Sequence, residues 1–261
     1  MSNTNHKRPE YQKEVEQLGL YKDATNFLFE NLASIKSHVS AEIPPPSRLR
    51  NLDSVFALGG LVYGEIHPLI LKAMEKKERL GHIKIGRDDM WCQKTRRIRI
   101  TSAPNTQEGV VVLGHELGHD VSCKDYFKGL QSMREIPARA VEIETAEHIR
   151  RFGMDTTSCE KNMIVSLTNL IEKIKSETDV ITGSTSKATP ARWNDIYRAD
   201  ILPYYFGAIF NVLRSEKHSD LVSIEDLLKM KNRDVLTLTK QMTESKKCVT
   251  GALDSFLERS L

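Results

Sequence analysis

Cysteine is scarce in this sequence, and its few copies are not spaced for a structural role. The four cysteines, Cys92, Cys123, Cys159 and Cys248, are scattered along 261 residues without a CxxC pair. A small disulfide framework or a cysteine zinc site would need a denser or more regular spacing, so neither is predicted. The simplest expectation is four reduced thiols in a protein that folds in a cytosol.

Long apolar runs are missing as well. No run approaches the roughly 18 residues that a membrane-spanning helix needs, so we expect no membrane partner. Residues 1–12 are polar and lack the apolar centre of a secretory signal peptide. We therefore expect a cytoplasmic protein, or one secreted into a host cell by a route that leaves no N-terminal signal.

Neither sign of charge is in large excess. The chain has 38 basic and 35 acidic residues, which gives a formal net charge of +3. Such a balance argues against nucleic-acid or membrane binding as the main activity. The length is sufficient for a substantial core, and we expect a single domain over residues 1–261.

The most informative feature that is present is the motif HExxH at residues 115–119. In a helix, residues four apart lie about 40° apart around the axis and roughly 6 Å along it, so His115 and His119 can face one metal ion. The motif is typical of zinc peptidases, in which zinc takes three protein ligands and activates a bound water. The sequence predicts these two histidines as ligands of one Zn²⁺ ion and Glu116 as the general base.

The residues before the motif indicate a buried helix. Asn105 is a suitable N-cap, and Glu108 follows three residues later, as in a capping box. The three valines at 110–112 are poor helix formers, so core packing must hold this helix. The alternative is a solvated helix face that binds no metal.

Two segments upstream of the motif, 82–85 and 97–101, alternate between apolar and polar residues as half-buried strands do. They predict a small sheet beside the metal helix. An edge strand at this position would hold an extended substrate by backbone hydrogen bonds, a mode of binding that tolerates many sequences.

A third metal ligand is expected after the motif. Glu135 is preferred, because Pro137 suits the first turn of a helix and places this glutamate at a helix start that faces the metal helix. Asp125 is the alternative, since it stands at the last position of the metzincin spacing HExxHxxGxxH/D, although Ser122 replaces the glycine of that pattern. The other candidates are Asp120, Glu142, Glu144 and His148.

These segments resemble the core of the gluzincin metallopeptidases. The HExxH helix and the following segment Glu-Ile-Pro-Ala-Arg-Ala at 135–140 are similar to the thimet oligopeptidase and oligoendopeptidase F group, and also to ImmA/IrrE-type metallopeptidases. The resemblance covers about residues 96–150, with a weaker part at 193–210. It implies that His115, His119 and Glu135 bind zinc and that the glutamate of the motif is the general base.

Two features depart from the pattern of that group. The interval between the second histidine of the motif and Glu135 is shorter than in the oligopeptidases. Arg139 stands where several gluzincins carry an acceptor that orients a histidine, and a guanidinium cannot accept. The orienting contact is therefore expected from Asp120, Glu142 or a backbone carbonyl.

A helical stretch expected at 190–217, with a kink at Pro203, adds a weaker similarity. The oligopeptidase group has a tyrosine-rich helix near its zinc, from which a phenol donates to the oxyanion. The resemblance implies this catalytic role for Tyr197 and Tyr204, although the histidine that normally precedes them in the family is missing here. The alternative is an aromatic face that packs into the core.

Together these observations predict a predominantly α-helical α+β fold, with a zincin-like metal helix and a small antiparallel or mixed sheet on one side. We expect N-terminal helices in residues 1–50, a zinc-site core in 82–150 and a helical scaffold in 156–261. Within the scaffold, helices are expected at about 156–177, 223–231 and 233–260.

The predicted function is that of a zinc-dependent endopeptidase acting on a protein or a peptide. The chain is too short for the closing lobe of the oligopeptidases, so we expect an open cleft that admits part of a folded protein. Its role would be housekeeping, or that of a bacterial effector that cleaves a host protein. The alternatives are a metzincin-like protease that uses Asp125, and a non-enzymatic helical binding or regulatory module.

Overall fold

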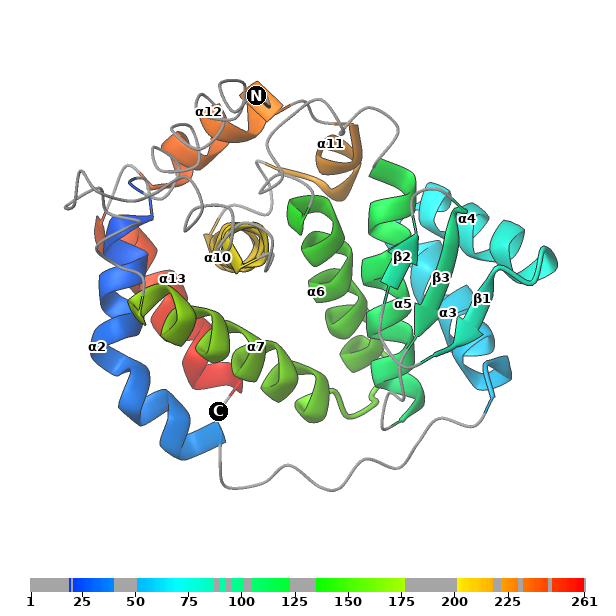
Figure 1. Cartoon of the computed structure of the whole chain (residues 1–261), viewed down its shortest axis with the longest axis horizontal. Helices are drawn as coiled ribbons and strands as arrows, with labels where there is room; N and C mark the ends of the chain where they lie inside the picture. The colour runs from blue at the N-terminus through cyan, green and yellow to red at the C-terminus, as the bar shows by residue number, and fades with distance from the viewer. Residues whose placement is uncertain are drawn as a thin grey trace, which may run out of the picture.

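A computed structural model describes residues 19, 21–39, 51–86, 90–92, 95–100, 105–122, 135–176, 201–217, 222–229, 232–243 and 246–260 of the chain. Helices make up most of these residues, and one small sheet lies at one side of the molecule (Figure 1). The expected class, predominantly helical with a small sheet, is confirmed. No helix in the described part of the chain is both long and apolar enough to cross a membrane.

The described helices are α2 (Lys22–Val39), α3 (Asp53–Ile66), α4 (Pro68–Arg79), α5 (Thr106–Ser122), α6 (Glu135–Arg151), α7 (Thr157–Ser176), α10 (Ile201–Lys217), α11 (Ile224–Lys229), α12 (Asn232–Thr243) and α13 (Lys246–Ser260). The stretch expected as a helix over 233–260 contains α12 and α13, and residues 244–245 between them lie outside the described part of the chain. Helix α10 covers the described part of the helical stretch expected at 190–217, and the rest of that stretch before Ile201, which bears on the expected kink at Pro203, lies outside the described residues.

The sheet consists of β1 (Ile83–Ile85), β2 (Met90–Cys92) and β3 (Arg97–Ile100), in the spatial order β1-β3-β2. Strand β1 runs parallel to β3, and β2 runs antiparallel to it. Side chains of β3 alternate between exposed and buried, as its sequence predicts. Because β3 lies in the middle, the described edges available to a substrate are β1 and β2.

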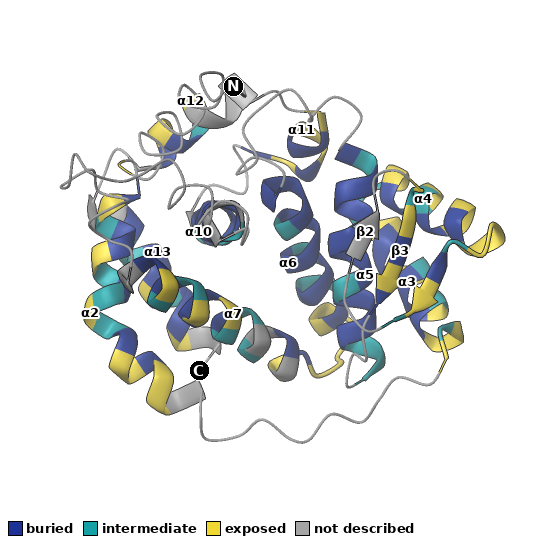
Figure 2. Ribbon diagram, viewed as in Figure 1, coloured by how far each residue is buried: buried dark blue, intermediate teal, exposed yellow. Residues whose placement is uncertain are grey.

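Helix α5 lies between the sheet and α6, so that the HExxH motif is in the interior of the molecule (Figure 1). It packs against α3, α4, β2 and β3 on one side and against α6 on the other. Helix α10 in turn packs against α6, α7 and α13. Figure 2 shows that α5 and α6 are buried along most of their length.

Contacts at both ends fix α5 in this position. At its start, the Asn105 side chain accepts a hydrogen bond from the Glu108 N–H at 2.8 Å, which is the expected N-cap. At its end, Asp120 Oδ1 lies 3.0 Å from Lys77 Nζ and 2.8 Å from Arg96 Nε. These ion pairs attach α5 to α4 and to the residue before β3. Asp120 therefore has a structural role at the helix end.

Candidate metal centre

The two histidines of the motif project from α5 toward the same point. The Nε2 atoms of His115 and His119 are 3.1 Å apart, and the two rings are nearly perpendicular. Both side chains are buried. Glu116 follows His115 on the same helix and is also buried, with 6% of its surface exposed.

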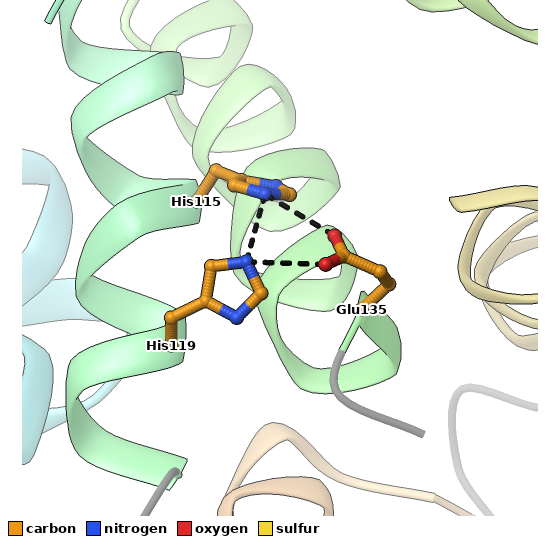
Figure 3. Close-up of side chains that lie close together, drawn as sticks. All are labelled: His115, His119 and Glu135. Carbon is orange, nitrogen blue, oxygen red and sulfur yellow. Dashed lines mark hydrogen bonds and ion pairs between the residues drawn. The ribbon is translucent and has the colours of Figure 1, made fainter. Parts of the chain in front are cut away.

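Glu135, the first residue of α6, brings its carboxylate to the two histidines (Figure 3). Its Oε2 lies 3.4 Å from His115 Nε2, and its Oε1 lies 3.5 Å from His119 Nε2. Ligand atoms of these three residues all lie within 4.8 Å of one another. Oε2 is buried and has no hydrogen-bond partner among the described residues. Such an atom is costly to bury unless a cation binds it.

Glycines at the helix contacts allow this close approach. A Cβ atom on Gly118 of α5 would lie 2.7 Å from the Cα of Ala138 on α6. A Cβ on Gly114, one turn earlier, would lie 2.7 Å from Thr145 Oγ1. The spacing of small residues four apart on α5 is a sequence signal for such an approach.

Helix α10 holds the start of α6 from the opposite side. A Cβ on Gly207 would lie 2.8 Å from Glu135 Cβ, so only glycine fits there without displacing Glu135. Asn211 is fully buried, and its side-chain amide donates to the Ile136 carbonyl at 2.8 Å. The sequence contains no pattern that pairs Gly207 or Asn211 with the metal site.

The charges of the cluster depend on one another. Burial lowers the pKa of His115, but the nearby carboxylates of Glu135 and Glu142 outweigh it, and the pKa is raised overall. Burial raises the pKa of Glu135, but the charge of His119 and the close contacts with both histidines hold it well below its usual value. An ionised carboxylate thus faces His115, whose raised pKa means that it binds a proton more readily than an ordinary histidine.

If a metal ion binds this cluster, its affinity should depend on pH. A metal ion bound through His115 would need the unprotonated imidazole, and the pKa of His115 lies above the usual value for histidine. We therefore expect zinc affinity to fall as the pH decreases through that raised pKa, which is an earlier onset than for an unperturbed imidazole of pKa about 6.5. Competition titrations with a chromophoric chelator at several pH values measure the zinc affinity as a function of pH. Affinity that is constant down to the usual histidine range would contradict the expectation.

Glu142 and Arg139 lie next to the cluster. The Glu142 carboxylate Oε2 is 2.9 Å from His115 Nδ1, and because an ionised carboxylate only accepts, Nδ1 is the donor. The Arg139 Nη1 donates to both oxygens of Glu142, each at 2.7 Å. Burial raises the pKa of Glu142, but Arg139 outweighs it, and the pKa is lowered overall. Glu142 thus supplies the orienting contact that was expected from it, from Asp120 or from a backbone carbonyl.

Of the two tyrosines predicted to act, Tyr204 lies beside the cluster. Its ring is parallel to that of His115 within 8°, with centroids 6.4 Å apart. The neighbouring Tyr205 is buried and bonds to Thr25 instead, in keeping with a core position. Tyr197 lies outside the described residues, as does Asp125, the alternative third ligand.

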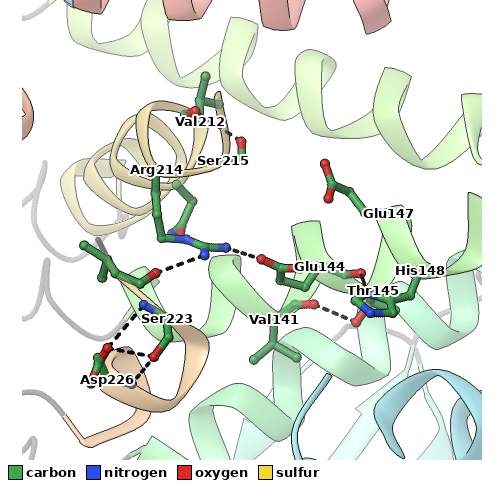
Figure 4. A network of polar contacts seen from close by, with 12 residues as sticks. Val141, Glu144, Thr145, Glu147, His148, Val212, Arg214, Ser215, Ser223 and Asp226 are labelled. Atoms are coloured by element: carbon green, nitrogen blue, oxygen red, sulfur yellow. Dashed lines mark hydrogen bonds and ion pairs between the residues drawn. The ribbon is translucent and has the colours of Figure 1, made fainter. Parts of the chain in front are cut away.

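The remaining ligand candidates are engaged elsewhere. Glu144 accepts from the buried Arg214 at 2.8 Å, in a network that joins α6, α10 and α11 (Figure 4). Arg214 also donates to the Val222 carbonyl at 3.2 Å. His148 Nδ1 lies 2.9 Å from the carbonyl of Glu144, one turn earlier on α6. These contacts stabilise the packing of the second half of α6, away from the two histidines of the motif.

Comparisons with known proteins do not assign the chain to a family: no family model matches it, and neither does any curated protein or solved structure. The geometry of the cluster is therefore the basis for a functional interpretation.

Proposed function

We propose that the chain is a zinc-dependent peptidase of the zincin type, with His115, His119 and Glu135 as the ligands of one Zn²⁺ ion. The spacing of the ligand atoms supports this most strongly. Two ligands about 2.0–2.1 Å from a tetrahedral zinc ion are about 3.3 Å apart. The two Nε2 atoms are 3.1 Å apart, and they lie 3.4 and 3.5 Å from the two different oxygens of Glu135. With one ligand atom from each residue, the three atoms lie within 4.8 Å of one another, close enough for one ion to bind all three after small side-chain movements. Two imidazoles and a carboxylate are also the ligand set of many catalytic zinc sites, which keep a fourth position open.

The proposed chemistry divides between the metal and the chain. When bound, zinc supplies a Lewis acid and a nucleophilic water. Glu116 accepts the proton of that water and delivers it to the leaving nitrogen, because a carboxylate next to the ligands on the same helix is within reach of both. Tyr204 is proposed to donate a hydrogen bond to the carbonyl oxygen of the scissile bond as negative charge develops there. The proposal extends this role to Tyr197.

The proposed substrate is an extended segment of a protein or peptide. Strand β2 is the edge of the sheet that contacts α5, so backbone pairing along β2 would bring the segment toward the metal cluster. Cleavage of a specific protein, either in the cell that makes the enzyme or as an effector in a host cell, is compatible with this mode of binding.

Metal content tests the proposal. We expect the purified chain to hold about one equivalent of zinc, and Glu135→Ala to lose it, because each structural ligand contributes strongly to affinity. Glu144→Ala is the matched control on the same helix, since this carboxylate pairs with Arg214. Asp125→Ala tests the metzincin-like alternative, in which Asp125 is the third ligand. Inductively coupled plasma mass spectrometry gives the stoichiometry.

The outcomes are distinct. No bound zinc in the wild-type chain would refute the metal site and favour a non-enzymatic helical module. Zinc that is retained in Glu135→Ala and lost in Asp125→Ala would assign the third ligand to Asp125.

A further inference from the structure

The arginine at position 139 occupies a place where the family pattern leads one to expect an acceptor. It is nevertheless connected to the metal cluster through Glu142. The chain of contacts runs from Arg139 Nη1 to both Glu142 oxygens, and from Glu142 Oε2 to His115 Nδ1. The opposite ring nitrogen of His115, Nε2, faces His119 and Glu135.

The position of the guanidinium is itself constrained. Its central carbon lies 5.3 Å from the centroid of the Tyr204 ring, within the range of a cation–π contact. On another side Arg139 borders an apolar cavity of about 20 Å³ between α6, α7, α10 and α13, lined in part by Ile143 and Leu167. Its Nε is buried and has no hydrogen-bond partner in the described part of the chain. The side-chain hydrogen bonds that Arg139 makes to described residues go to Glu142.

A histidine binds a metal through a nitrogen that carries a lone pair. For His115 to bind through Nε2, its proton must be on Nδ1, and an acceptor held at Nδ1 favours this tautomer. Glu142 is a flexible side chain that is buried at 8% exposure, so its orientation depends on its partners. Arg139 donates hydrogen bonds to both carboxylate oxygens of Glu142, and this keeps Oε2 of Glu142 directed at Nδ1 of His115.

We propose that Arg139 is a positioning residue that selects the tautomer of His115: by holding Glu142, it keeps the proton on Nδ1 and leaves the Nε2 lone pair for the metal. This inference rests on the proposed metal site. It adds a residue that acts on the proposed site through Glu142, and it explains why an arginine stands at position 139.

The first test reads the tautomer directly in the metal-free protein. Long-range ¹H–¹⁵N correlation spectra at alkaline pH, where imidazoles are neutral, distinguish Nδ1–H from Nε2–H for His115. We expect the Nδ1–H form in the wild type and a mixture of both forms in Arg139→Gln. Arg139→Lys, which keeps a cationic donor, should restore most of the Nδ1–H form. Arg150→Gln, an exposed site on the same helix, is the matched control and should resemble the wild type.

The second test measures zinc affinity by chelator competition. Loss of a residue that orients a ligand typically reduces metal affinity about 10–100-fold, and we expect a loss in this range for Arg139→Gln. In a Glu142→Gln background the same substitution should have little further effect, because Arg139 acts through Glu142. If Arg139 only packed against Tyr204, its loss would be equally large in both backgrounds.

The results separate this inference from the proposed function. An unchanged tautomer in Arg139→Gln would overturn the inference, whether or not zinc affinity falls. A wild-type chain that binds no zinc would refute the metal site, while the tautomer comparison would still decide the role of Arg139. If Arg139→Gln does not fold, Arg139→Met keeps the apolar contact with Tyr204, and the same outcomes apply to it.

Discussion

Glu116→Gln is expected to remove most peptide hydrolysis while the zinc content stays at the wild-type level. The substitution keeps the shape of a buried side chain but removes the carboxylate that accepts and delivers the proton. General acid–base catalysis typically contributes 10²–10⁴-fold, so we expect a loss of roughly this size in kcat/KM. Hydrolysis of an unfolded protein and of a peptide mixture measures it, together with metal analysis of the same sample.

The control is Glu147→Gln on α6, whose carboxylate pairs with surface arginines and should retain wild-type activity. Hydrolysis by Glu116→Gln at the wild-type rate would show that the proposed base is wrong. The same pair of proteins also identifies substrates, since proteins cut by the wild type and not by Glu116→Gln depend on the proposed chemistry.

Gly118→Ala is expected to destabilise the fold and weaken zinc binding together. The added Cβ would lie 2.7 Å from the Ala138 Cα, so the backbones of α5 and α6 must move apart. Overpacking of this kind costs typically 1–3 kcal/mol in free energy of unfolding. The movement also carries Glu135 away from the histidines, because Glu135 and Ala138 lie in the same turn at the start of α6.

Urea unfolding of the metal-free protein and a zinc titration measure the two effects. Gly251→Ala is the matched control: this glycine also lies in a helix, α13, but nothing is within 4 Å of a Cβ added there. Alanine is the better helix former by about 1 kcal/mol, so the control should be neutral or slightly stabilising. Wild-type stability and zinc affinity in Gly118→Ala would contradict the role assigned to this contact.

Local signals in the sequence were sufficient for the elements that carry the site. The N-cap at Asn105 and the proline after Glu135 mark helix starts, and both lie where the structure has them. The alternation in 97–101 indicates a strand, and most of that segment is β3. Each of these features depends on residues close together in the chain, whose side chains determine capping and burial directly.

The contacts between elements could not be derived in the same way. That Glu142 rather than Asp120 reaches His115 depends on the rotation of α6 about its axis, which packing across the whole interface determines. The order β1-β3-β2 likewise follows from long-range pairing, since strand patterns alone do not say which strand is central. The contact of Gly207 with Glu135 joins segments about 70 residues apart and has no local signature.

The packing of α10 on the first turn of α6 has a consequence for where the functional unit ends. All three proposed ligands lie before residue 136, yet Gly207 and Asn211 are the residues that hold Glu135 and its neighbour in place. A fragment that ends before Ile201 would contain all three proposed ligands. It would lack α10, which packs against Glu135, the third of them. The smallest portion of this protein that could be transplanted with the proposed metal site therefore extends well beyond the three proposed ligands and includes α10.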